Sequence, residues 1–232
     1  MASQVYLIPT FLDEHALQVL PAYILEAVEK CNVFFVENER SARRYLKQLK
    51  KEIVIDDFEW FTIGKAEGEV LHTFRDKIKA DNVIGIISEA GCPGVADPGQ
   101  LLIAAAQELN ATVIPLVGPS SVLLALMASG MNGQQFAFAG YLPIDNLQRA
   151  KAIRDLEAES KKKDCTQIFI ETPYRNNQML ETLLKTCQPA TRLCIAVNIT
   201  GPDEWIKTKT VQQWQQQNAD LHKKPAIFLL KA

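Results

Sequence analysis

The sequence predicts an α/β protein, and three observations support this prediction. Short apolar runs rich in β-forming residues alternate with segments whose apolar residues recur at helical spacing. The chain has 232 residues, which is enough to bury a sizeable core. Apolar residues make up 47% and charged residues 22% of the chain, the balance of an ordinary folded protein.

The periodicity places the elements along the chain. We predict helices over residues 22–30, 68–79, 101–109 and 178–186, and strands over residues 4–8, 33–37, 83–88, 112–117, 136–141, 167–171, 192–198 and 226–230. This alternation favours parallel-rich sheets that carry helices on both faces.

The character of the chain changes near residues 120–135. Before this stretch, nearly all-apolar strands are joined by helices. After it come a Gly-Met-Asn-Gly turn at 130–133, a polar segment at 144–164 and a strand-rich end. We therefore predict two lobes, an N-terminal α/β lobe of residues 1–118 and a C-terminal α/β lobe of residues 119–232.

Charge and cysteine content narrow the class of protein. The chain carries 25 Lys+Arg and 27 Asp+Glu, so it lacks the overall basic surplus of many nucleic-acid-binding proteins. Its five cysteines are odd in number and show no CxxC spacing, so we expect neither a disulfide framework nor a metal site. Neither a signal peptide nor a membrane-spanning run is evident, and we expect a soluble, cytoplasmic protein.

The most informative stretch is the loop of residues 88–99, Ser-Glu-Ala-Gly-Cys-Pro-Gly-Val-Ala-Asp-Pro-Gly. It follows a buried strand, where ligands of open α/β sheets bind. Its three glycines and two alanines leave little side-chain bulk, so a ligand can approach the main chain closely. It matches no phosphate-binding motif, which favours a neutral or cationic ligand.

This loop resembles the S-D-A-G-T-P-G-I-S-D-P-G motif of the tetrapyrrole methylase superfamily, in the branch of the ribosomal RNA small-subunit methyltransferase I enzymes. Four further segments resemble motifs of that branch in the same order. They are residues 37–40 (E-D-T-R in the family), 117–121 (containing G-P-S-A), 136–143 (F-x-F-x-G-F-L-P) and 171–175 (E-S-P-H-R).

The resemblance implies a two-lobed tetrapyrrole methylase-like fold, with S-adenosylmethionine in a cleft between the lobes, and a homodimer. Carried over by position, it assigns cofactor binding to Phe11, Glu89, Ala90, Gly91, Cys92, Ser120, Ser121, Thr172, Asn198 and Ala226. Methyl transfer needs binding and alignment rather than a covalent nucleophile, so no catalytic role is expected for Cys92.

Several charged residues are candidates for work on the methyl acceptor. A hydroxyl acceptor would benefit from a base, for which Glu37, Glu39 and Glu171 are candidates because they follow strands. Arg40 and Arg175 could orient an anionic acceptor. Alternatively, the three glutamates are solvated or helix-capping carboxylates, and the two arginines form structural ion pairs. These alternatives stay open. Our catalytic candidates are therefore Glu37, Arg40 and Glu171.

Part of the chain departs from the pattern of the branch. The first loop reads Ile-Pro-Thr-Phe-Leu at 8–12, where the branch has A-T-P-I-G-N-L, and Glu89, Cys92, Ala96 and Tyr174 replace Asp, Thr, Ser and His.

The basic run at 40–51 could present Arg43, Arg44, Lys47 and Lys51 on one helix face near Tyr45 as an RNA contact; a plain solvated face is the alternative.

Three functional hypotheses follow. The first is an S-adenosylmethionine-dependent methyltransferase that acts on RNA, at a ribose 2′-hydroxyl of small-subunit rRNA or of a related RNA. The second is a methylase of a tetrapyrrole-like small molecule, which the near-neutral charge favours. The third is a non-catalytic module that binds S-adenosylmethionine or RNA, an option that the altered first loop keeps open.

Overall fold

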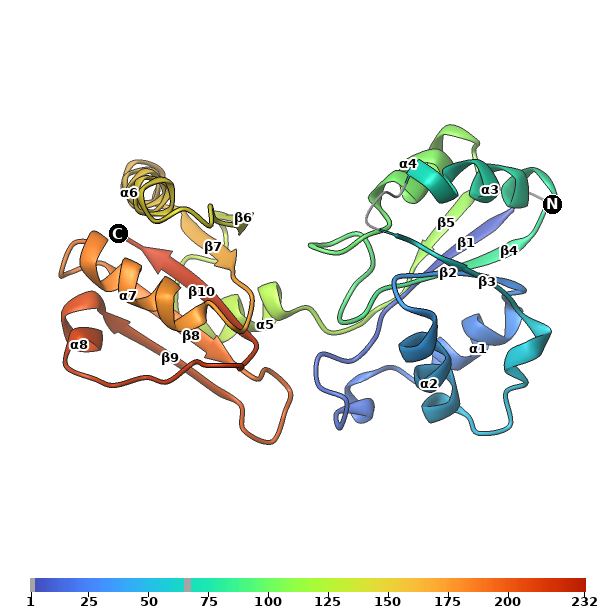
Figure 1. The fold of residues 1–232 in the computed structure, drawn as a ribbon, viewed down its shortest axis with the longest axis horizontal. Helices are drawn as coiled ribbons and strands as arrows, with labels where there is room; N and C mark the ends of the chain where they lie inside the picture. The colour runs from blue at the N-terminus through green and yellow to red at the C-terminus, as the bar shows by residue number, and fades with distance from the viewer. Residues whose placement is uncertain (1–2, 65–67) are drawn as a thin grey trace. The chain divides into compact units, whose positions relative to one another are not determined.

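Five parallel strands form the sheet of the N-terminal unit (Figure 1). The computed structural model describes residues 3–64 and 68–232 and divides into two compact units, Met1–Ser120 and Ser121–Ala232. In the first unit the strand order is β3-β2-β4-β1-β5. The strands are β1 (Gln4–Ile8), β2 (Val33–Val36), β3 (Glu59–Thr62), β4 (Val83–Ile87) and β5 (Thr112–Pro115).

Helices cover both faces of this first sheet (Figure 1). On one face, α1 (Tyr23–Lys30) and α2 (Glu39–Leu49) bury their apolar stripes against Ile8, Phe34 and Val36. On the other, α3 (Gly68–Lys79) and α4 (Gln100–Glu108) pack on Val5, Phe35 and Ile84. Successive residues of a strand thus point into two different cores on opposite faces of the sheet, as the near-continuous apolar runs predict.

The sheet of the C-terminal unit is mixed, in the order β6-β7-β10-β8-β9. Its strands are β6 (Phe136–Tyr141), β7 (Thr166–Ile170), β8 (Arg192–Val197), β9 (Trp205–Thr210) and β10 (Ala226–Lys231). Only β6 and β7 pair in parallel, and the other three pairings are antiparallel. The prediction of parallel-rich sheets is correct for the first unit and wrong for this one.

Helices also lie on both faces of this second sheet. The helix α5 (Ser121–Ser129) packs against β8, β9 and β10. The opposite face carries α6 (Asn146–Lys163), α7 (Asn176–Thr186) and α8 (Val211–Gln215), which share one core with Phe169, Ile195 and Phe228.

Several elements were not among the predicted helices and strands, and three of them show why. The helix α6 was expected only as a polar segment, because its buried stripe is mostly polar: Arg149, Glu157 and Ser160 join Ile153 there. The strands β3 and β9 were not predicted. Both are edge strands whose residues are only half-buried or exposed, so they lack a continuous apolar run.

Candidate functional site

The candidate site of the N-terminal unit lies at the carboxyl edge of its sheet. Because all five strands are parallel, the loops that follow β1, β2, β4 and β5 leave from this same edge. Ligands of open α/β sheets bind at such an edge. The loop of residues 88–99 follows β4, a central strand of the sheet, and ends at Gly99, which precedes α4.

The first loop holds the long loop in place through main-chain contacts. The Thr10 N–H donates to the Gly91 carbonyl at 2.9 Å, which forms an isolated antiparallel bridge. The Thr10 hydroxyl donates to the Ser88 carbonyl at 3.3 Å. Thr10 was not among the predicted site residues, because a contact between segments 80 residues apart leaves no local sequence signal.

Glycine geometry makes this arrangement possible. Gly91 has a φ of +73°, and a β-carbon on it would lie 3.3 Å from Leu12 Cδ2 and 3.4 Å from the Pro119 carbonyl oxygen. Gly118 lies still closer to its neighbour, since a β-carbon there would be 2.1 Å from Pro9 Cβ. The loops after β1, β4 and β5 therefore approach one another so closely that little room is left for a β-carbon at Gly91 and none at Gly118.

Carboxylates gather beside the long loop. The Glu89 N–H donates to Glu37 Oε2 at 3.1 Å, and the Glu89 carboxylate accepts from the Ser41 hydroxyl in the first turn of α2. Asp97 completes the group. Its burial and the charge of Glu37 raise the pKa of Asp97 to about 6, with a smaller contribution from Glu89 and an opposing hydrogen bond from Ser88.

Neither Ser41 nor Asp97 was predicted as a site residue. Asp97 stands inside the resembling motif, so the motif itself was the available signal. Nothing in the sequence connects Ser41 to Glu89, which is 48 residues away. Burial and the repulsion by Glu37 also show that Asp97 sits in an environment that opposes a further negative charge.

The remaining predicted residues of this unit take different positions. Phe11 packs edge-to-face on Tyr45 with ring centroids 5.7 Å apart, and Ala90 is exposed. Cys92 is half-buried with its Sγ 3.6 Å from the Pro119 carbonyl oxygen, and burial followed by the charge of Asp97 raises the pKa of its thiol. A thiol with a raised pKa, such as that of Cys92, is a poor nucleophile. Arg40 is exposed in the first turn of α2, which Asn38 caps.

The predicted residues of the C-terminal unit gather at one edge of its sheet. The strands β7 and β8 end at this edge while β10 begins there, because β10 runs antiparallel to both. Thr172 directly follows Glu171 in the loop after β7, Asn198 follows β8, and Ala226 starts β10 opposite Val197. The Asn198 N–H donates to the Pro225 carbonyl at 3.0 Å.

The units divide between the predicted residues Ser120 and Ser121. Ser120 is half-buried at the end of the N-terminal unit, and Ser121 is the first residue of α5. Ser120 therefore belongs to the N-terminal unit and Ser121 to the C-terminal unit.

Glu171 is fully buried and paired. Its Oε1 accepts from Arg175 Nη2 and from the Thr172 N–H, both at 2.6 Å, and its side chain is 0% exposed. Burial alone would raise the pKa of Glu171, but the hydrogen bonds from Arg175 and Thr172 outweigh it, so the pKa lies below its ordinary value. This environment suits a carboxylate that stays ionised and holds Arg175.

The basic run on α2 forms an exposed face without the predicted tyrosine. Arg44, Lys47 and Lys51 are exposed, and Arg43 pairs with Glu39 and lies over the Trp60 ring. Tyr45 is only 2% exposed, and its hydroxyl donates to the Pro9 carbonyl at 2.8 Å. The expectation of Tyr45 near the basic face was wrong, because this ring faces the sheet instead.

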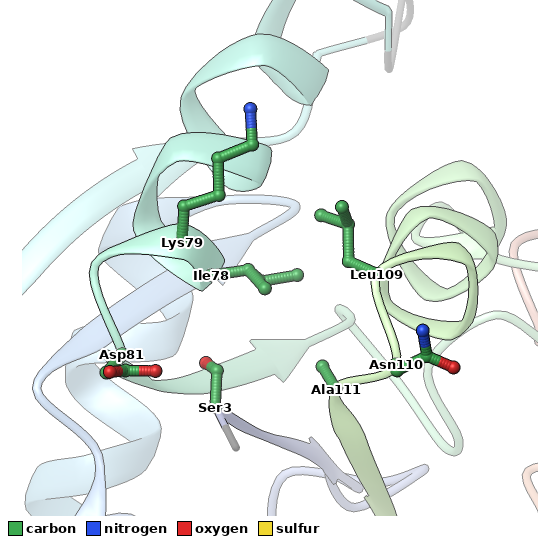
Figure 2. Close-up of a pocket in the computed structure, with 7 residues that line it drawn as sticks. All are labelled: Ser3, Ile78, Lys79, Asp81, Leu109, Asn110 and Ala111. Atoms are coloured by element: carbon green, nitrogen blue, oxygen red, sulfur yellow. The ribbon is translucent and has the colours of Figure 1, made fainter. Parts of the chain in front are cut away.

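A cavity of about 220 Å³ lies elsewhere, at the amino edge of the first sheet (Figure 2). Ser3 precedes β1 and Ala111 precedes β5, so this cavity is at the end of the strands opposite to the long loop. Its wall also includes Ile78 and Leu109 from the ends of α3 and α4. None of the predicted site residues lines it.

Within residues 3–64 and 68–232, no cluster of three or more His, Cys, Asp or Glu side chains is arranged to hold a metal ion. Among the helices described there, none combines the length and apolar character that crossing a bilayer requires.

Comparisons with known proteins place these observations in a family. A family model for the tetrapyrrole (corrin/porphyrin) methylases matches residues 20–215. The chain is 27% identical over 228 residues to the Ribosomal RNA small subunit methyltransferase I of Buchnera aphidicola subsp. Schizaphis graminum, covering 97% of this chain and 76% of that relative. It is 25% identical to the protein of the same name from Escherichia coli O157:H7, covering 98% of this chain and 77% of that relative.

Solved structures give the same fold. The crystal structure of the methyltransferase CobJ matches with a TM-score of 0.66 at 16% identity, covering 99% of this chain and 94% of that one. Uroporphyrin-III-C-methyltransferase from Thermus thermophilus matches with a TM-score of 0.59 at 16% identity, covering 100% of this chain and 93% of that one. Because the family model spans most of the sequence, the chain belongs to the tetrapyrrole methylase family.

Proposed function

We propose that this protein transfers the methyl group of S-adenosylmethionine to RNA, at a ribose 2′-hydroxyl of small-subunit rRNA or of a related RNA. The family uses S-adenosylmethionine as methyl donor. Relatives that align along almost the whole chain carry the name of a small-subunit rRNA methyltransferase. The observation that carries the proposal is the glycine-rich loop after β4, which the Thr10 N–H binds at the Gly91 carbonyl.

The residues of this loop fit the methyl donor. Ala90 is exposed and has a small side chain, and the buried Gly91 beside it adds no side-chain bulk, so a nucleoside or an amino-acid moiety can approach the main chain at Ala90. The carboxylates of Glu37, Glu89 and Asp97 lie beside the loop and complement a cation. When bound, the donor supplies an activated methyl group on a sulfonium. The chain then has to bind the donor, orient the acceptor toward its methyl group and exclude water.

We assign the cofactor contacts to two sets of residues. In the N-terminal unit they are Phe11, Glu89, Ala90, Gly91, Cys92 and Ser120. In the C-terminal unit they are Ser121, Thr172, Asn198 and Ala226. The second set is supported by the shared sheet edge that carries Thr172, Asn198 and Ala226.

Two of the three candidate bases, Glu37 and Glu171, differ in their surroundings. Glu37 is half-exposed at the carboxyl edge and could accept a proton from a hydroxyl acceptor. Glu171 is buried and held by Arg175 and Thr172, so we propose that it positions Arg175 rather than taking a proton. Arg40, exposed at the start of α2, is a candidate to orient an acceptor phosphate.

A second candidate function is methylation of a tetrapyrrole-like small molecule. The uroporphyrin-III-C-methyltransferase from Thermus thermophilus shares the fold over the whole chain. At 16% identity, however, this likeness concerns the fold alone. The net charge of −2 favours this alternative, since an RNA enzyme must then bind through local patches. The alignments to rRNA methyltransferases, which cover 97% and 98% of this chain, favour RNA.

Transfer of labelled methyl groups tests the proposal. The purified protein is incubated with methyl-labelled S-adenosylmethionine and fractionated lysate, and the labelled fraction is identified. We expect label in small-subunit rRNA. Label in a small pigment, with blank rRNA, would establish the tetrapyrrole alternative. Tight donor binding without any labelled fraction would indicate the non-catalytic module.

We further propose that the protein is a cytoplasmic homodimer. Ile144 and Leu147, at the start of α6, are 66% and 82% exposed, and such apolar side chains suit burial against a second copy. Light scattering after size exclusion gives the mass directly. A monomer at micromolar concentration would contradict the dimer.

A further inference from the structure

A fixed guanidinium stands at the end of β7. Arg175 donates from Nη2 to the buried Glu171 carboxylate at 2.6 Å, while its own side chain stays 32% exposed. Its Nε is buried and has no hydrogen-bond partner within the described residues. The pair therefore fixes the direction of the guanidinium but leaves part of its hydrogen-bonding capacity unused.

Two exposed tyrosines flank this arginine. Tyr141 ends β6 and lies in register with Ile170 at the end of the parallel strand β7, which brings it close enough to Arg175 to interact with its charge. Tyr174 is the residue before Arg175, and its ring packs edge-on at 6.4 Å from the His222 ring. Tyr141 is 58% and Tyr174 is 72% exposed. Exposed aromatic rings beside a guanidinium offer faces on which bases can stack.

Positive charge adjoins the same surface. The Lys223 N–H donates to the Pro173 carbonyl at 3.0 Å, which places the 222–224 loop beside the 171–175 loop. His222 and Lys223 are both exposed. Because the Glu171 carboxylate offsets the charge of Arg175, Lys223 adds positive charge to this surface.

We propose that Tyr141, Tyr174 and Arg175 form the contact surface for an unpaired segment of the acceptor RNA. Arg175 donates to a backbone phosphate, and the tyrosine rings stack on bases. Single-stranded RNA is recognised in this way, by aromatic rings that stack on bases together with cations that contact the backbone. Glu171 is then a positioning residue. This inference rests on the proposed function, since it takes RNA as the acceptor.

The fold explains why this surface suits an acceptor. Thr172, a proposed donor contact, is two residues before Tyr174 in the same loop, so donor and acceptor contacts adjoin along one short segment. Asn176, the first residue of α7, is fully buried and donates to the Lys224 carbonyl at 2.7 Å. The loop is therefore anchored at both ends, by Glu171 and by Asn176, and presents its exposed side chains from a fixed base.

Substitution of the most exposed tyrosine tests the surface with little risk to folding. We compare Tyr174→Ala with Tyr174→Phe, which keeps the ring, and with Phe136→Ala as matched control. Phe136 is a 41% exposed aromatic at the opposite end of β6. Binding of a fluorescent unpaired rRNA fragment, the KM for rRNA and the Kd for S-adenosylmethionine are measured separately.

We expect Tyr174→Ala to weaken RNA binding and to raise the KM for rRNA by roughly 5- to 100-fold. The donor Kd should stay unchanged, and Tyr174→Phe and Phe136→Ala should bind RNA like the parent protein. In addition, Arg175→Gln should reduce the slope of log K against log salt by about 0.7, the value for one lost phosphate contact on a single strand.

The outcomes separate this inference from the proposed function. If the parent protein methylates rRNA while Tyr174→Ala binds RNA normally, this contact surface is wrong and the proposed function stands. If the parent protein binds the donor but methylates no RNA, both fail. If Tyr174→Ala instead impairs methylation of a small pigment, the surface binds a tetrapyrrole and the RNA contact is overturned.

Discussion

A β-carbon added to Gly118 would lie 2.1 Å from Cβ and 2.4 Å from Cγ of Pro9. These two residues belong to the loops after the adjacent strands β5 and β1, which leave the first sheet at the same carboxyl edge as the long loop after β4. Real β-carbons do not approach other atoms so closely, and the proline ring cannot turn aside. The close approach of the two loops therefore depends on a glycine at position 118.

Gly118→Ala should consequently destabilise the protein and loosen the candidate site. Overpacking of this kind costs about 1–3 kcal/mol of the free energy of unfolding, or roughly 2–4 °C in Tm per kcal/mol for a chain of this size. Thermal unfolding and calorimetric binding of S-adenosylmethionine measure both effects.

Gly133→Ala provides the control, since a β-carbon there meets nothing within 4 Å. This variant should unfold and bind like the parent protein. If Gly118→Ala and Gly133→Ala unfold and bind the donor equally, the loops after β1 and β5 can separate without loss of stability or of donor affinity.

Gly91→Val should abolish donor binding. The residue has a φ of +73°, which β-branched side chains rarely adopt, and its β-carbon would crowd Leu12 and the Pro119 carbonyl. Strain of about 1–3 kcal/mol is expected in the long loop. Calorimetric titration with S-adenosylmethionine measures the loss.

Gly130→Val separates the backbone strain from the site. Gly130 has a similar φ of +65° in the C-terminal unit, with nothing within 4 Å of its β-carbon. It should lose stability and keep donor affinity. Donor affinity unchanged in Gly91→Val would count against the placement of the donor on this loop.

Buried apolar strands were the part of the fold that the sequence predicted best. The bounds of the buried strand β1 agree with the prediction, and those of β2 and β4 differ by one residue, because apolar runs bounded by polar residues mark strands clearly. The bounds of β6, a mostly exposed edge strand, agree as well. The helix α6 was missed, since a buried arginine and a buried glutamate interrupt its apolar stripe. Arg149 is 1% exposed and is satisfied by Thr182, Asn146 and the Ile144 carbonyl, contacts that the sequence does not reveal.

The candidate site was predicted through motifs and not through contacts. The motifs identified the loop of residues 88–99 and the segment Glu171–Arg175, and the structure describes the geometry of both. They contained no sign of the Thr10–Gly91 bridge or of the Ser41–Glu89 hydrogen bond. Such contacts join segments far apart in the chain, and only the order of strands in the sheet brings them together.

Asp97 should make the stability of the protein fall as the pH rises from about 4 to 6. Burial, and then the charge of Glu37, raise the pKa of this carboxyl from 3.8 to about 6 in the folded state. Between these two pKa values the folded protein holds a proton that the unfolded chain has released. The contribution is therefore complete below pH 3.8 and lost as the pH passes through 6.

Urea unfolding from pH 4 to pH 7 checks this, with Asp97→Asn for comparison. The difference in the free energy of unfolding between parent and variant should shift in favour of the variant as the pH rises. A difference that stays constant with pH would show that Asp97 titrates normally.

Glu171→Gln should destabilise the protein most at neutral pH. The Glu171 carboxylate is fully buried and accepts from Arg175 and from the Thr172 N–H, and a hydrogen bond to a charged group contributes about 1.5–3 kcal/mol. Its pKa is lowered in the folded state, so this stabilisation is present above the unfolded value near 4.5 and is lost as the pH falls through the folded value. The cost of the substitution should therefore shrink in acid.

Glu181→Gln is the matched control for this measurement, because Glu181 also pairs with a basic residue four positions on, Lys185, but on an exposed helix surface. Exposed pairs of this kind contribute little, since solvent screens them, so Glu181→Gln should unfold like the parent protein at every pH. Urea midpoints at pH 7, 5, 4 and 3 compare the two variants. Equal effects of both substitutions would mean that burial gives the Glu171–Arg175 pair no special strength, and Glu171 would then lose its role in fixing the guanidinium.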